Sequence, residues 1–229
     1  MNIQPRQVFI VDDEIDIRVS LSRLLAVGGY EAHSFDSAEA FLAAQETETP
    51  GCLLLDVSMP GMSGLALQDA LAESKRGQPI VFLTGRGDVP SSVRAMRAGA
   101  VGYLTKPIDS VLLFAAVDRA LGLDAAERRA AAIRRAIESR VESLTRRERQ
   151  VLEHVVCGRL NKQIAADLGT GEKTVKVHRG RVMSKMGARS VAELVQLSAR
   201  VGVSMTLFLR THRPLMGQSE PPTCKASTH

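Results

Sequence analysis

The sequence predicts a doubly wound α/β domain with a five-stranded parallel sheet, followed by a small all-α domain. Between residues 7 and 122, short apolar runs alternate five times with helical patterns, whereas only helical patterns follow from residue 144. Strict alternation of strand and helix is typical of a parallel sheet with right-handed crossovers and helices on both faces. We expect the strand order 2-1-3-4-5.

The charge distribution also divides the chain. Residues 1–122 carry 10 Lys and Arg against 15 Asp and Glu, whereas the remaining residues carry 20 against 10, so the net charges are −5 and +10. A basic half joined to an acidic half indicates that one end binds a polyanion, most simply nucleic acid. We predict a first domain over 1–122, a helical linker over 123–143, a second domain over 144–203 and a largely disordered tail over 204–229.

Several classes of protein are disfavoured. The three cysteines, Cys52, Cys157 and Cys224, are odd in number and scattered, without a CxxC pair or a histidine cluster at metal-ligand spacing. A disulfide framework and a structural zinc site are therefore not expected. The N-terminus has no signal-peptide pattern, and no apolar run approaches the roughly 18 residues that span a bilayer. We expect a soluble cytoplasmic protein without a membrane partner.

The strands of the first domain are predicted from their apolar runs. These runs are QVFIVDD, YEAHSF, CLLLDV, PIVFLTG and GYLTKP, and the helical patterns lie near 16–28, 37–45, 63–74, 90–98 and 109–121. A run as apolar as Cys52–Leu55 is typical of a strand buried on both faces. Asp56, at its C-terminal end, is then expected at the rim of the sheet, where open α/β sheets place their sites.

The linker is predicted to be one helix, because residues 123–143 are rich in Ala, Arg and Glu and contain no Pro or Gly. Along it, Ile133, Ile137, Val141 and Leu144 recur on one face. This stripe is too short to establish a coiled coil. It suits packing on the second domain as well as packing on a partner subunit.

The second domain is predicted to hold four short helices. Thr145 and Glu148 match a capping box at the start of the first, and Gly158 suits its end. The second helix reads NKQIAADL, and the others are expected over about 172–186 and 190–200. Small helices separated by tight glycine turns in a basic domain are typical of a helix-turn-helix.

Polar residues follow four of the predicted strands. They are Asp12 and Asp13, Asp56, Thr84, and Lys106 with Pro107. The carboxyl ends of parallel strands meet at one edge, so three carboxylates would gather there and require a cation. Oxygen ligands that leave room for water and phosphate suit Mg²⁺. One Asp could then attack phosphorus to form an acyl phosphate, with Lys106 and Thr84 stabilising the phosphoryl oxygens.

Each of these residues alone has an ordinary structural explanation, but the combination DD, DVSMPGMSG, TG and YLTKP resembles the receiver domain of two-component response regulators. The resemblance implies a flavodoxin-like receiver in which Asp56 is the phosphoacceptor. It implies Mg²⁺ ligands at Asp12, Asp13, Asp56 and the backbone carbonyl of Ser58. It also implies that Thr84 and Lys106 approach the phosphate, that Tyr103 changes rotamer with Thr84 in the switch, and that the Lys106–Pro107 peptide is cis.

The helix predicted near residues 172–186 has two unlike faces at about 100° per residue. One stripe holds Val175, His178, Val182 and Met186. The opposite side carries Lys173, Lys176, Val177, Gly180 and Arg181. One packed and one basic face suit a recognition helix in a major groove. Because His178 lies on the packed stripe, we expect a hydrogen-bonded interior histidine without a catalytic role.

The stretches LTRRERQVL, NKQIAADL, KTVKVHR and KMGARS resemble the LuxR-type DNA-binding domain, and with a receiver they resemble the NarL/FixJ class. This resemblance implies that Lys176 and Val177 face base edges, and that Thr174, Arg179 and Lys162 contact phosphates. Lys173 and Arg181 complete the expected basic face. Two positions depart from the pattern: Gly171 replaces the usual Ser N-cap, and Gly180 removes a side chain from the DNA face.

We therefore expect a transcription regulator that a sensor histidine kinase phosphorylates on Asp56. It would catalyse only its own phosphorylation and dephosphorylation. The resemblance implies a homodimer through about Val89–Gly102 on phosphorylation, and promoter DNA and RNA polymerase as partners. One alternative is a small phosphatase or hydrolase, although Ser58 stands where a second Asp would be expected. Another is a DNA-binding regulator whose receiver is a phosphorylation-independent interaction domain.

Overall fold

The structure is a computed structural model that describes residues 6–44, 49–74, 77–85 and 89–203. The chain divides into two compact units, Met1–Ala130 and Ala131–His229. The predicted tail, 204–229, lies outside the described residues, so its expected disorder stays a prediction. Within the described ranges, no helix is both long enough and apolar enough to cross a membrane.

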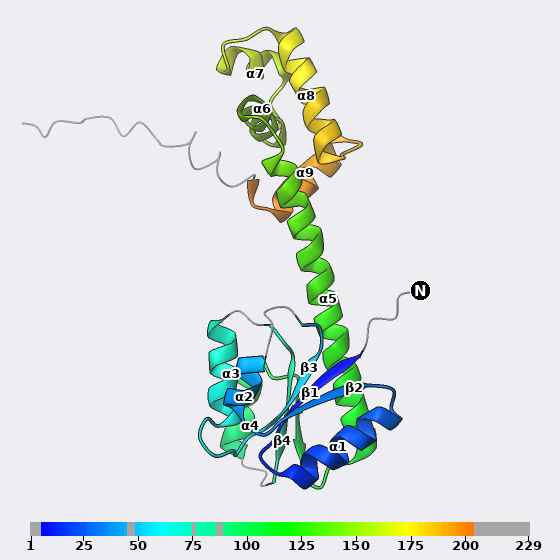
Figure 1. Ribbon diagram of the computed structural model, residues 1–229. Helices are drawn as coiled ribbons and strands as arrows, with labels where there is room; N and C mark the ends of the chain where they lie inside the picture. The colour runs from blue at the N-terminus through cyan, green and yellow to red at the C-terminus, as the bar shows by residue number, and fades with distance from the viewer. Residues whose placement is uncertain (1–5, 45–48, 75–76, 86–88, 204–229) are drawn as a thin grey trace, which may run out of the picture. The chain divides into compact units, whose positions relative to one another are not determined.

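The first unit contains a five-stranded parallel sheet (Figure 1). Its strands are β1 (Gln7–Val11), β2 (Glu31–Phe35), β3 (Cys52–Asp56), β4 (Ile80–Thr84) and β5 (Gly102–Thr105). The order is β2-β1-β3-β4-β5, which confirms the predicted order. Every residue of β3 is buried, as its unbroken apolar sequence predicted.

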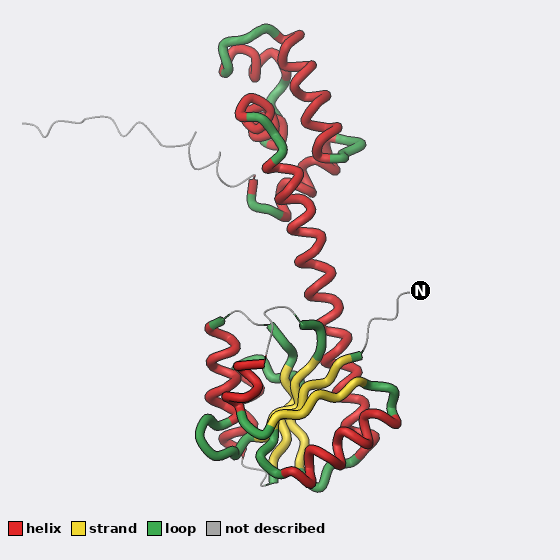
Figure 2. The backbone as a smooth tube through the Cα atoms, in the orientation of Figure 1, coloured by secondary structure: helices red, strands yellow, loops and turns green. Residues whose placement is uncertain are grey.

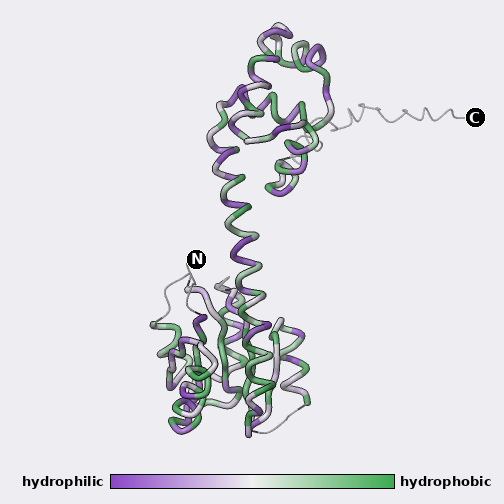
Figure 3. Tube along the Cα trace, turned by 90° about the vertical axis from the view of Figure 1, so that its right-hand side faces the viewer, coloured by the Kyte–Doolittle hydropathy of each residue, from purple (hydrophilic) through white to green (hydrophobic). Residues whose placement is uncertain are grey.

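Helices cover both faces of the sheet (Figure 2). They are α1 (Ile15–Val27), α2 (Ala38–Ala44), α3 (Gly64–Glu73), α4 (Val89–Arg97) and α5 (Ser110–Glu142). On one face Leu25 of α1 and Leu113 of α5 pack on the strands, and on the other Phe41 of α2 and Leu67 of α3 do so. Hydrophobic residues accordingly concentrate along the strands inside this unit (Figure 3).

Helix α5 continues past Gly122, the predicted end of the first domain. The turns of α5 that follow Gly122 form hydrogen bonds with the first unit. The Asp124 carboxylate is buried and accepts a hydrogen bond from the Gly51 backbone N–H at 3.1 Å. The Arg128 guanidinium donates to both oxygens of Asp124, at 2.8 and 2.9 Å, and to the Thr49 carbonyl at 2.9 Å. Part of the predicted linker is thus fixed to the sheet domain.

The second unit is helical, with α6 (Arg146–Val156), α7 (Asn161–Asp167), α8 (Glu172–Met186) and α9 (Val191–Arg200). Its core includes Ile137, Val141 and Leu144 from the predicted linker stripe. Ile133, the first member of that stripe, is 44% exposed. Three of the four apolar residues therefore pack on the helical domain, one of the two possibilities that the sequence left open.

Local signals fix the ends of these helices. Glu148 N–H donates to Thr145 Oγ1 at 3.3 Å, and Thr145 N–H donates to Glu148 Oε2 at 2.9 Å, which confirms the predicted capping box. Gly158, after α6, has φ 76°, and Gly187, the C-cap of α8, has φ 67°. These left-handed conformations favour glycine, which has no Cβ to clash.

Candidate phosphoacceptor site and DNA-binding surface

A lysine ammonium joins two carboxylates at the carboxyl edge of the sheet. Asp12 follows β1, Asp56 ends β3, and Lys106 follows β5. Lys106 Nζ lies 2.8 Å from Asp12 Oδ2 and 2.9 Å from Asp56 Oδ1. Both carboxylates are buried, so the parallel sheet brings together residues that the sequence analysis placed at one edge.

Short backbone hydrogen bonds orient the two carboxylates. Ser58 N–H donates to Asp56 Oδ2 at 2.7 Å, and Glu14 N–H donates to Asp12 Oδ1 at 2.9 Å. In each carboxylate, one oxygen therefore accepts a hydrogen bond from the loop that follows the strand. The other oxygen points towards Lys106. Asp56 presents its Oδ1 in a fixed direction at the rim.

Glu14 is a member of this cluster that the sequence analysis missed. Its Oε1 lies 3.1 Å from Lys106 Nζ, although its side chain is 61% exposed. The available signal was its position directly after Asp12 and Asp13, which makes three acids in a row. Asp13 is exposed, and its backbone carbonyl accepts a hydrogen bond from Arg18 at 2.9 Å.

The electrostatics follow from burial and from the ion pairs. Burial raises the pKa of Asp12, while the nearby Lys106 ammonium acts in the opposite direction. Burial alone would lower the pKa of Lys106, but its contacts with Asp12, Asp56 and Glu14 outweigh burial and raise it. Lys106 is consequently a fixed positive charge at neutral pH.

Thr84 lies on β4, which pairs with β3, and Tyr103 lies on β5, which pairs with β4. Thr84 is buried at the end of β4, and its carbonyl accepts a hydrogen bond from Lys106 N–H at 2.7 Å. The Tyr103 ring lies 6.2 Å from the Phe82 ring, measured between centroids. Its hydroxyl is buried and has no hydrogen-bond partner among the residues that the structure describes. The Lys106–Pro107 peptide is cis, as the resemblance implied.

Helix α8 separates a packed face from a basic face. Val175, Val182 and Met186 are fully buried. Lys173, Thr174, Lys176, Val177, Gly180 and Arg181 are exposed. The two faces agree with the helical periodicity in the sequence and leave a basic surface that suits the backbone of DNA.

His178 and Arg179, neighbours on α8, are both half-buried. The Nδ1 atom of His178 is buried and has no hydrogen-bond partner in the described part of the chain. The expected full hydrogen bonding of His178 is therefore wrong for this nitrogen. Arg179 donates to Asn161 Oδ1 at 2.9 Å and so ties α8 to the start of α7. Lys162 is exposed.

Comparisons with known proteins find a family match for each of the two units. Residues 8–118 match the family described as response regulator receiver domain, and residues 142–198 match bacterial regulatory proteins of the luxR family. Nodulation protein W of Bradyrhizobium diazoefficiens is 44% identical over 86% of this chain and 87% of its own length. The chain belongs to the response regulators with a LuxR-type DNA-binding domain.

Other relatives support this assignment. Transcriptional regulatory protein FixJ of Azorhizobium caulinodans is 42% identical over 86% of this chain and 93% of its own length. The solved structure of response regulator StyR covers 86% of this chain and 100% of its own, with 45% identity and a TM-score of 0.79. Phosphorylation-switched transcription regulation fits this pair of domains, and neither alternative drawn from the sequence is favoured.

The acidic edge of the response regulator can be tested for its fit to Mg²⁺. Among the described residues, no group of three or more His, Cys, Asp or Glu side chains is arranged to hold a metal. The carboxylates of Asp12 and Asp56 nevertheless converge on the same ammonium. Mg²⁺ commonly takes one or two carboxylates with water and phosphate oxygens, so two carboxylates fit its requirements.

Gly64 is required where α3 of the response regulator begins, beside Asp56. A Cβ added there would overlap the carbonyl oxygen of Asp56. We expect Gly64→Ala to lower the free energy of unfolding by about 2 kcal/mol and to slow phosphorylation, because the loop must move. Gly122→Ala is the control, since its Cβ would meet no atom within 4 Å. Equal unfolding free energies for the two variants in urea would contradict this account.

Leu160 is an unusual N-cap for α7 of the response regulator. Its side chain is 68% exposed and makes no capping hydrogen bond, although its N–H donates to Gln163 Oε1 at 2.9 Å. We expect Leu160→Ser to stabilise α7 by about 1 kcal/mol, because the hydroxyl can accept a free helix N–H. Hydrogen exchange of the α7 amides measures the gain. Leu160→Ala should give none, and equal protection in both variants would exclude capping as the cause.

Proposed function

We propose that Asp56 accepts a phosphoryl group from a sensor histidine kinase, and that the phosphorylated chain binds double-stranded promoter DNA as a homodimer. The observation that carries this proposal is the buried contact of Asp56 Oδ1 and Asp12 Oδ2 with one ammonium, that of Lys106. In a chain with a basic helical domain, such a site suits a switch better than a hydrolase.

The chemistry needs few groups. A carboxylate oxygen of Asp56 attacks the phosphorus of a phosphohistidine, the P–N bond breaks, and the imidazole leaves with the electron pair of that bond. Lys106 is already within ion-pair distance of Asp56 and neutralises charge on the transferred group. Water reverses the modification by attacking the acyl phosphate, so the chain catalyses only its own phosphorylation and dephosphorylation.

We assign the Mg²⁺ site to Asp12, Asp13, Asp56 and the carbonyl of Ser58. The carboxylates of Asp12 and Asp56 converge in the structure, and Asp13 follows Asp12 directly in sequence. When bound, Mg²⁺ would supply positive charge that stabilises the phosphoryl oxygens during transfer. Lys106 and the backbone N–H of Ser58 orient Asp56 for attack.

The proposed switch connects this edge to a dimer surface. Thr84 would turn towards the phosphate, and Tyr103 would change rotamer beside it. Helix α4 exposes three apolar side chains on one stripe, Val89 at 70%, Val93 at 43% and Met96 at 49%. An apolar stripe with this spacing suits a second copy of the chain, which would use Val89–Gly102.

The proposed DNA surface is the exposed side of α8. Lys176 and Val177 would reach base edges, while the phosphates would be contacted by Lys162, Lys173, Thr174, Arg179 and Arg181. Residues 123–143 would link this domain to the receiver. Because promoter DNA is its target, the regulator would act in the bacterial cytoplasm, with RNA polymerase as a further partner.

The test uses beryllofluoride, a phosphoryl mimic, with Mg²⁺ and the full chain. We expect the mimic to produce dimers in sedimentation velocity and to tighten binding to DNA selected from a random pool. Lys176→Ala should still dimerise but lose about tenfold in DNA affinity, since one base contact is worth about 1–3 kcal/mol. Unchanged assembly and DNA binding with the mimic bound would leave a regulator without a phosphorylation switch.

A further inference from the structure

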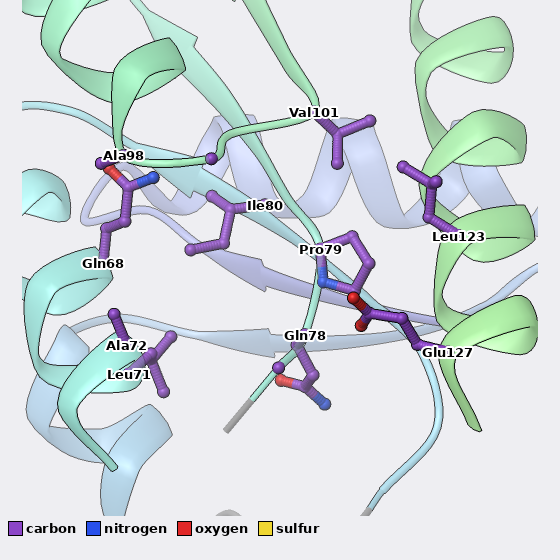
Figure 4. A pocket seen from close by; sticks show the side chains of 12 residues that line it. Gln68, Leu71, Ala72, Gln78, Pro79, Ile80, Ala98, Val101, Leu123 and Glu127 are labelled. Atoms are coloured by element: carbon purple, nitrogen blue, oxygen red, sulfur yellow. The ribbon is translucent and has the colours of Figure 1, made fainter. Parts of the chain in front are cut away.

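A cavity of about 260 Å³ lies at the amino edge of the sheet, opposite to the edge that carries Asp56. It reaches from α3 to α5 across the first residues of β4 and the loop before β5 (Figure 4). Its apolar walls are formed by Leu71, Pro79, Ile80, Val101 and Leu123. The cavity lies wholly within the first unit and has no part in the proposed phosphorylation chemistry.

Small residues keep this cavity open. Ala72, Gly77, Ala98 and Gly99 contribute little or no side chain to its lining. A Cβ on Gly99 would meet nothing within 4 Å, and one on Gly77 would only touch Glu127 Oε2 at 3.6 Å. A hollow with apolar walls and a few polar groups has the composition of a ligand site.

Two polar side chains line opposite walls of the hollow, Gln68 of α3 and Glu127 of α5. Gln68 of α3 is only 4% exposed, and its Nε2 donates to the Ala95 carbonyl at 3.2 Å. Its Oε1 has no hydrogen bond within the described ranges. On the opposite wall, the Glu127 carboxylate extends from α5 towards Pro79 (Figure 4). Glu127 forms no ion pair with any residue that the structure describes.

We propose that this cavity binds a small organic cation with an apolar body and one protonated nitrogen group. The Glu127 carboxylate supplies negative charge beside apolar walls, so the complementary ligand has an apolar body and a positively charged donor. The volume is below the roughly 300–1,000 Å³ typical of drug-sized ligands, which limits the body to about one aromatic ring. The bound cation contacts α3 and α5 together.

Benzamidine is the probe, because it joins one ring to one amidinium. Titrated into the full-length ¹⁵N-labelled protein, it should shift the amide signals of Gln68, Ala98 and Val101 with a Kd of about 1 mM. Benzyl alcohol and benzoate, with the same ring but no positive charge, should bind at least tenfold more weakly. Equal shifts from all three compounds would overturn the assigned ligand class.

Two variants locate the site. Glu127→Gln should weaken benzamidine binding about tenfold, as expected for the loss of one charge-assisted hydrogen bond. The matched control is Glu73→Gln, which removes an exposed carboxylate of α3 that does not line the cavity and should leave the Kd unchanged. Ala72→Leu should fill the hollow and abolish the shifts. Absence of shifts in the wild type, or binding that survives both Glu127→Gln and Ala72→Leu, overturns the proposal.

Discussion

Asp56→Asn is expected to abolish the phosphoryl adduct that forms when the intact protein is incubated with Mg²⁺ and a small acyl-phosphate donor. Asparagine keeps the shape of the side chain but has no carboxylate oxygen to attack phosphorus. It also removes the negative charge that holds Lys106 Nζ at 2.9 Å. Phosphorylation-dependent DNA binding should be lost together with the adduct.

Intact-mass spectrometry measures the adduct, and Asp16→Asn is the matched control. Asp16 is an exposed carboxylate of α1 outside the Lys106 cluster, so its variant should form one adduct as the wild type does. An adduct on Asp56→Asn would place the phosphoacceptor elsewhere. Failure of both the wild type and the control to accept phosphoryl or beryllofluoride would refute the proposed switch itself.

Glu148→Gln is expected to destabilise the helical domain by about 1.5–3 kcal/mol, the usual range for a hydrogen bond to a charged group. Glu148 is buried at the start of α6, where its Oε2 lies 2.7 Å from Lys185 Nζ of α8. The same oxygen accepts the Thr145 N–H, and Lys185 also donates to the Ser143 carbonyl at 3.0 Å. One carboxylate therefore holds together two helices and the end of the linker.

The same carboxylate makes the stability of this domain depend on pH. The hydrogen bond from Lys185 and then that from the Thr145 N–H lower the pKa of Glu148 to about 2, against an ordinary value of 4.5. Because the folded pKa is the lower one, the contribution is fully present above about pH 4.5 and is lost as the pH falls towards 2. Hydrogen exchange of the α6 and α8 amides between pH 5 and 3 should report this loss.

Glu142→Gln is the matched control, since Glu142 is an exposed carboxylate near the end of α5. It should retain both the stability and the acid transition of the wild type. Glu148→Gln should instead start from a lower stability and lack this part of the transition. If the acid dependence of the two variants were the same, another group would have to cause it.

Much of the fold and part of the site follow from local pattern. The apolar sequence of Cys52–Leu55 predicted a central strand, and the position of Asp56 after it predicted a residue at the rim. The turn from Asp56 to Gly64 and the capping box at Thr145 are equally local. These features could be predicted because burial, strand direction and capping leave regular traces in sequence.

Contacts between distant residues could not be predicted in this way. Glu14 and Lys106 are 92 positions apart, and the position of Glu14 after Asp12 and Asp13 does not by itself show that its exposed carboxylate contacts the ammonium. The hydrogen bond from Arg179 to Asn161 likewise depends on how α7 and α8 pack. Such contacts depend on how whole helices and strands are placed in space, and a short stretch of sequence does not carry this information.

The sequence by itself determined the alternation of strands and helices, the acidic edge with Asp56, and the basic face of α8, because periodicity and the direction of parallel strands fix them. Only the tertiary structure decided that α5 is attached to the sheet domain as far as Arg128 and to the helical domain from Ile137. It also formed the cavity between Gln68 and Glu127. These features arise where separate elements pack side by side, and their physical cause is the fit between surfaces that lie far apart along the chain.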